Sequence, residues 1–183
     1  MLSAEHKIWL LDEVVSTAFA SWHIYIAGYD KFNDWPEEQQ GLAAYTGYTT
    51  LTVLLSHSLM SACYALVDSG QRSYSIHHAV KDPTLVITPL AKRECENCLI
   101  LRSKIATYRN NVTAHVNTKR TQTDWAQFAD IKNAEIDAFL LSARTVVEEL
   151  GKANLGVHFI PSSRMSFQGD FREFCRVLLD QSS

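Results

Sequence analysis

Residues 39–67 carry no Asp, Glu, Lys or Arg, and this uncharged run restricts the possible folds more than any other feature. A run of this length is long enough to cross a bilayer as a helix. It also holds Gln39, Gln40, His57 and several Thr and Ser residues, which are unfavourable in a hydrocarbon core. We therefore expect a central helix that is buried on several sides in a soluble, cytoplasmic protein with no secretory signal and no membrane partner.

Apolar residues recur every three or four positions along the chain, which is the spacing of amphipathic helices, and no segment alternates as a strand does. The expected helices cover about residues 3–29, 34–69, 75–80, 88–112, 124–129, 133–153 and a last segment that begins near residue 169. Their expected start signals are Asp34, Thr88, Pro89 and Asn133, and their expected stop signals are residues 30–33 and residues 68–70. Gly151 and Gly156 are expected to bracket the end of the helix over 133–153.

The apolar stripes of these helices predict the core. The four longest stripes are Leu11, Val14, Val15, Ala18, Phe19, Trp22 and Ile26; Leu51, Leu55, Leu59, Ala62 and Leu66; Cys98, Leu101, Ile105, Tyr108 and Val112; and Ile136, Phe139, Leu140, Ala143, Val147 and Leu150. No composition break or repeat marks a second domain. The sequence therefore predicts an all-α fold, a four- to five-helix up-and-down bundle formed by residues 1–183 as a single domain.

Charge is unevenly distributed along this chain. Residues 92–120 hold seven Lys or Arg and two Glu, a net charge of +5, whereas the rest holds ten basic and eighteen acidic residues, a net charge of −8. A basic segment in an acidic protein can steer an anionic partner. On charge alone, a solvated helix face is the simpler interpretation.

The four cysteines do not indicate a disulfide scaffold in a chain of 183 residues. Cys95 and Cys98 form a C-x-x-C pair, but within a helical pattern and without the second pair that a zinc site needs. We interpret them as packing residues, and expect neither a metal nor a cofactor.

The segment Arg109-Asn110-Asn111-Val112-Thr113-Ala114-His115 holds the side chains needed for work on a phosphodiester. A guanidinium matches phosphate oxygens, histidine exchanges protons near neutral pH, and an amide orients groups. On an ideal helix Arg109 and His115 lie about 120° apart, while Asn111 and His115 share a face. The alternative is structural, with Arg109 bound to helix-end carbonyls and His115 in a turn.

Together with Tyr108, this segment resembles the signature of the HEPN superfamily, in which an Arg is followed after four to six residues by a His and often directly by an Asn. The helix order and the Ala-His ending resemble the subgroup linked to phage abortive infection. The resemblance implies an HEPN-like bundle with metal-independent RNA endonuclease activity, as a toxin or defence effector. It also implies a possible nucleotidyltransferase-like antitoxin as partner.

Carried over to this chain, the resemblance makes Arg109 the contact to the scissile phosphate, His115 the acid or base, and Asn110 the orienting residue. We further expect Arg102, Lys104, Tyr108 and Asn111 to bind RNA.

The cleavage chemistry itself predicts a homodimer. When the 2′-OH attacks the adjacent phosphate, one group must accept its proton and another must protonate the leaving oxygen. One histidine cannot conveniently do both, whereas a two-fold cleft brings together two copies of His115 and Arg109.

Two other functions remain open from the sequence. The first is a non-catalytic HEPN-like module for dimerisation or binding, in which Arg109 is occluded or paired with a carboxylate. The second is a metal-binding helical bundle in which His23 and His57 join a three-histidine site.

Overall fold

The computed structural model describes residues 2–33, 42–70, 74–109, 131–156 and 159–162, and it is helical without a strand in these ranges. The helices are α1 (Ala4–Asn33), α2 (Leu42–Val67), α3 (Ile76–Ala79), α4 (Pro89–Ile100), α5 (Arg102–Tyr108) and α7 (Asn133–Leu155). The all-α prediction is confirmed. Within the described ranges, no helix has the length and apolar character needed to cross a membrane.

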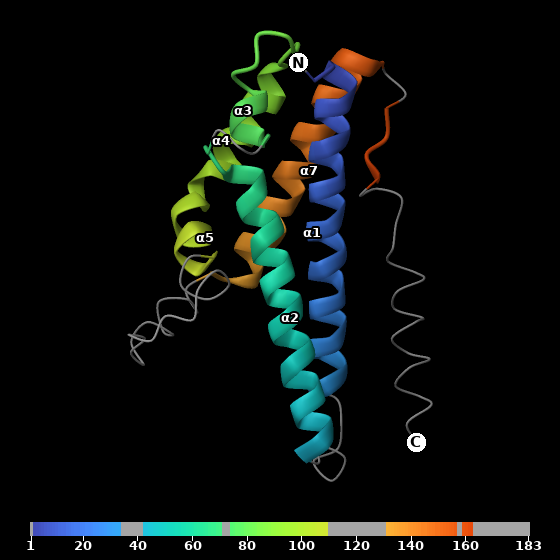
Figure 1. The fold of residues 1–183 in the computed structure, drawn as a ribbon, viewed down its shortest axis with the longest axis vertical. Helices are drawn as coiled ribbons and strands as arrows, with labels where there is room; N and C mark the ends of the chain where they lie inside the picture. Colours follow the sequence, from blue (N-terminus) through green and yellow to red (C-terminus); the bar gives the residue numbers. More distant parts are fainter. Residues whose placement is uncertain (1, 34–41, 71–73, 110–130, 157–158, 163–183) are drawn as a thin grey trace.

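The long helices lie side by side and alternate in direction, as Figure 1 shows. The chain descends along α1, returns along α2, descends again through α4 and α5, and returns along α7. Helix α1 packs against both α2 and α7, while α4 packs against α7 and α5 against α2. The described helices thus form an up-and-down bundle in which α4 and α5 together make up one member, between α2 and α7 in the chain.

The core runs between these helices and matches the predicted stripes closely. All six stripe residues of α7 are buried, and so are Leu11, Val15, Ala18, Phe19 and Trp22 of α1. Thr88 begins α4 as predicted, because its Oγ1 accepts a hydrogen bond from the backbone N–H of Ala91 at 3.1 Å.

Helix α2 differs from the predicted central helix. Leu59, Ala62 and Leu66 are buried, but Leu54 is 60% exposed, and Ser58 and Ser61 on the same side of the helix are also exposed. A helix in a bundle of this kind keeps one face toward solvent. Neutral Thr and Ser residues can occupy that face, so the absence of charge did not indicate burial.

Several predicted boundaries are wrong by a few residues. Helix α1 continues through residues 30–33, which were expected to form a turn. The residue at the N-terminal cap of α7 is Lys132, whereas the sequence predicted Asn133. The Glu135 side chain accepts a hydrogen bond from the backbone N–H of Lys132 at 2.8 Å. The expected helix over 88–112 is interrupted at Leu101, whose φ of −86° and ψ of −3° separate α4 from α5.

Gly151 and Gly156 bracket the end of α7, as predicted, and Gly151 lies inside the helix. A Cβ at this position would overlap the ring of Phe159, so the glycine lets the returning chain approach the helix closely. Helix α7 ends at Leu155, and Gly156 follows it with a φ of +126°, a conformation that favours glycine.

The predicted start of the second helix at 34–37, the short helix at 124–129 and the last helix from 169 lie outside the described residues.

Candidate functional site

Arg109 is the one residue of the predicted catalytic set that lies among the described residues. Asn110 and His115, together with the proposed RNA-binding residue Asn111, lie outside them. The geometry between Arg109 and His115 therefore stays a prediction.

Arg109 directly follows α5 and continues its helical backbone, with φ −55° and ψ −47°. Its guanidinium carbon lies 4.9 Å from the centroid of the Tyr64 ring on α2. At this distance the positive charge is attracted to the face of the ring. The contact ties the position of the half-buried Arg109 side chain to α2 as well as to α5.

Sequence reasoning missed Tyr64. It lies beside the predicted stripe of its helix, 45 positions before Arg109, and nothing in its local pattern connects it with the motif. Only the packing of α2 against α5 brings the two residues together.

Lys104 and Tyr108, both expected to bind RNA, contact other parts of the bundle. The Lys104 ammonium lies 3.0 Å from Oε1 of Glu135, so a carboxylate on α7 offsets its charge. The pKa of Glu135 is lowered first by the backbone N–H of Lys132 and then by Lys104. Tyr108 is half-buried against the core, as a packing residue is. The RNA contacts proposed for both residues stay predictions.

Arg102 lies at the start of α5 and donates a hydrogen bond to Oγ of Ser69, just after α2. Its charge also helps, after burial and Lys81, to lower the pKa of His77 in α3. Lys81 completes this group, with its Nζ 3.0 Å from Nε2 of His77. Sequence reasoning overlooked Lys81, although it lies four positions after His77.

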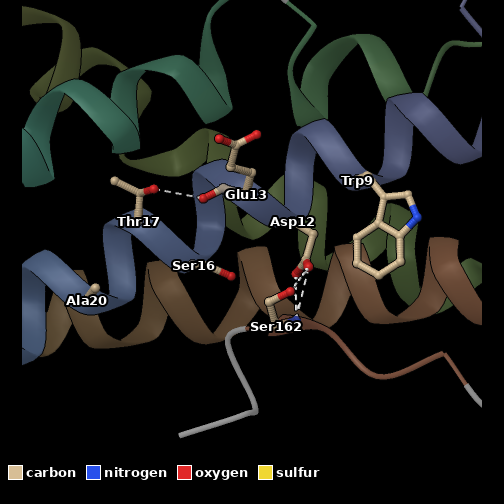
Figure 2. A pocket seen from close by; sticks show the side chains of 7 residues that line it. All are labelled: Trp9, Asp12, Glu13, Ser16, Thr17, Ala20 and Ser162. Atoms are coloured by element: carbon tan, nitrogen blue, oxygen red, sulfur yellow. Dashed lines mark hydrogen bonds between the residues drawn. The ribbon is translucent and has the colours of Figure 1, made fainter. Parts of the chain in front are cut away.

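A separate groove of about 450 Å³ follows the outer face of α1. Figure 2 shows its lining residues, which are Trp9, Asp12, Glu13, Ser16, Thr17, Ala20 and Ser162. Asp12 is buried and accepts from Ser162 three hydrogen bonds, two shared by the backbone N–H at 3.0 and 3.1 Å and one from Oγ at 2.6 Å. Because these bonds engage both carboxylate oxygens, Asp12 anchors the chain at Ser162.

The C-x-x-C pair packs in the core, as predicted. Cys95 and Cys98 are buried free thiols whose sulfurs lie 3.9 and 3.8 Å from the carbonyl oxygens of Ile76 and Phe139. Burial raises the pKa of Cys95 to about 11, so this thiol is not activated. Among the residues that the structure describes, no group of three or more His, Cys, Asp or Glu side chains is arranged to hold a metal ion.

No protein-family model matches this chain, and no match was found among curated proteins or among solved structures. The resemblance to the HEPN superfamily thus rests on residues 108–115 and on the order of the helices.

Proposed function

We propose that this protein is a metal-independent RNA endonuclease of the HEPN type that acts in the cytoplasm as a toxin or phage-defence effector. The observation that carries the proposal is the sequence motif Arg109-Asn110-x4-His115, whose Arg109 directly follows helix α5. The contact between Arg109 and Tyr64 supports it, because an arginine that binds a reacting phosphate must be held in position.

In the proposed reaction the RNA 2′-hydroxyl attacks the neighbouring phosphorus and the 5′-oxygen leaves. Arg109 binds the scissile phosphate with its forked donors, and Asn110 orients the reacting groups. His115 of one subunit accepts the 2′-hydroxyl proton, while His115 of the partner subunit protonates the leaving oxygen. The products are a 2′,3′-cyclic phosphate and a free 5′-hydroxyl.

The homodimer is part of this proposal, because a single motif supplies one histidine for two proton transfers. Analytical ultracentrifugation at micromolar concentration tests it. A strict monomer that still cleaves RNA would refute the paired-histidine mechanism.

The first experiment is RNA cleavage in excess EDTA by the wild type, Arg109→Ala and His115→Ala, with Arg93→Ala as the control. Arg93 belongs to the same basic segment but is paired with Glu94 at 2.9 Å. We expect cleavage with cyclic phosphate ends by the wild type and the control, and none by the two motif variants at unchanged melting temperatures. Cleavage by His115→Ala at the wild-type rate would refute the proposal.

Tyr64 offers a test of positioning. Tyr64→Phe keeps a ring face for the guanidinium, whereas Tyr64→Leu removes it. We expect Tyr64→Leu to slow cleavage more than Tyr64→Phe does at a similar melting temperature. Equal rates in both variants would show that the ring does not position Arg109.

A second candidate function is a non-catalytic module that dimerises and binds RNA or another partner. The half-buried state of the Arg109 side chain favours it, since an occluded motif arginine is what such a module predicts. It would bind RNA in the cleavage assay without cutting it, with or without EDTA.

A further inference from the structure

Three basic side chains gather where α2 ends, beside α3 and the start of α5. Lys81 Nζ lies 3.0 Å from Nε2 of His77, and Arg102, which bonds to Ser69, is near enough to lower the pKa of His77. We call His77, Lys81 and Arg102 the basic cluster. The ion pairs found among the described residues involve four other basic residues, Lys7, Arg93, Lys104 and Lys152. Within the described chain, no carboxylate therefore pairs with Lys81 or Arg102.

The contact between Lys81 and His77 determines which ring nitrogen of His77 carries the proton. An ammonium has only donors, so Nε2 of His77 must accept, and the ring proton then resides on Nδ1. Nδ1 is buried without a hydrogen-bond partner. Burial first, and then the charges of Lys81, Arg102 and His78, lower the pKa of His77. Burial and the positive charge of its neighbours thus both favour the neutral imidazole, and a bound anion would offset the effect of the charge.

The basic cluster is continuous with the proposed catalytic motif. Arg102 and Arg109 are seven residues apart, so they lie on the same side of α5 to within about 20° and about 10 Å apart along its axis. A single RNA strand that places one phosphate at Arg109 can place another at Arg102.

We propose that Lys81 and Arg102, beside the neutral His77, bind a backbone phosphate of the RNA strand whose scissile phosphate lies at Arg109. This inference rests on the proposed function and adds a substrate-positioning site to it. Arg102 offers a planar fork and Lys81 a compact ammonium to the phosphate oxygens, and both charges are neutralised. With the anion bound, His77 no longer faces uncompensated positive charge and takes up a proton more readily.

The test uses the whole protein and a fluorescent, single-stranded RNA of about ten nucleotides with 2′-O-methyl groups, which binds but cannot be cut. Binding is measured by anisotropy between 50 and 200 mM salt for the wild type, Lys81→Gln, Arg102→Gln and the control Arg93→Gln. Each cluster variant should bind roughly fivefold more weakly at 0.1 M salt, and the slope of log K against log salt should fall by about 0.7. The control variant should retain the wild-type affinity and slope.

Histidine NMR on the wild type provides a second readout that does not depend on a variant. The pKa of His77 should rise when the RNA binds, because the phosphate offsets Lys81 and Arg102. His78, whose Nδ1 lies 2.9 Å from Oγ of Ser75, serves as the neighbouring reference.

The outcomes separate this inference from the proposed function. Cluster variants that bind as the control does, or a pKa of His77 that is unchanged by bound RNA, would overturn the phosphate site while leaving cleavage at Arg109 intact. A response of His77 to inorganic phosphate but not to RNA would assign the cluster to free phosphate and also overturn it. A wild-type protein that does not bind RNA would overturn both.

Discussion

Replacing Gly151 with alanine should destabilise this protein, although alanine is normally the better residue inside a helix. Gly151 is buried within α7, and the ring of Phe159 occupies the space that a Cβ would fill. Phe159 in turn packs against Trp9, with ring centroids 5.3 Å apart, so it cannot move away without losing that contact.

The expected magnitude follows from two opposing terms. Alanine is favoured over glycine in a helix by about 1 kcal/mol. Overpacking costs about 1–3 kcal/mol, and we expect the upper half of this range because the overlap falls on the ring of Phe159. Gly151→Ala should therefore lower the free energy of unfolding by about 1–2 kcal/mol. In a Phe159→Ala background the overlap is gone, and the same change should raise stability by about 1 kcal/mol.

The assay is urea unfolding of the wild type, both single variants and the double variant, read as a double-mutant cycle. The sign of the Gly151→Ala effect should reverse between the two backgrounds, with a coupling free energy of about 2–3 kcal/mol. An effect of the same sign and size in both backgrounds would refute the reasoning, because it would mean that Phe159 does not lie against Gly151.

Three further predictions concern buried polar groups and thiols. The pKa of Asp82 is held below its ordinary value, first by a 2.6 Å hydrogen bond from Lys7, so its contribution is present above about pH 4 and is lost as the pH falls further. Asp82→Asn should lower stability by about 1–3 kcal/mol at pH 7. Between pH 7 and 3, the urea unfolding midpoint of the variant should fall less steeply than that of the wild type, and equal slopes would contradict this. Burial raises the pKa of Cys98, so peptide mapping should find it unmodified by iodoacetamide in the native protein and modified in urea; equal labelling in both states would be contrary evidence. Ser162→Ala removes a 2.6 Å hydrogen bond to the buried Asp12 carboxylate and should cost about 1.5 kcal/mol in urea unfolding, whereas an unchanged midpoint would count against this anchor.

The helices were predictable because their signals are local. The α7 stripe recurs with helical spacing, and a Thr-Pro start such as Thr88-Pro89 supplies a cap and a fixed φ within two residues. Such signals need no knowledge of what the helix packs against. The motif is also a local signal, because it consists of Arg109, Asn110 and His115 at a fixed spacing in the sequence.

What could not be predicted depends on how the helices rotate against each other. The contact of Arg109 with Tyr64 and the hydrogen bond of Arg102 to Ser69 join segments that no local pattern connects. Gly151 shows the same limit, since a glycine that ends a helix and one that admits a neighbouring ring look alike in a sequence.

The bond between Asp12 and Ser162 has a consequence for synthesis of the chain. It joins residues 150 positions apart, so the buried carboxylate of the first helix has no such partner until almost the whole described bundle has been translated. At about 5–20 residues per second, this delay is roughly 8–30 s. Until then water can hydrate the Asp12 carboxylate, and this part of the bundle is completed late.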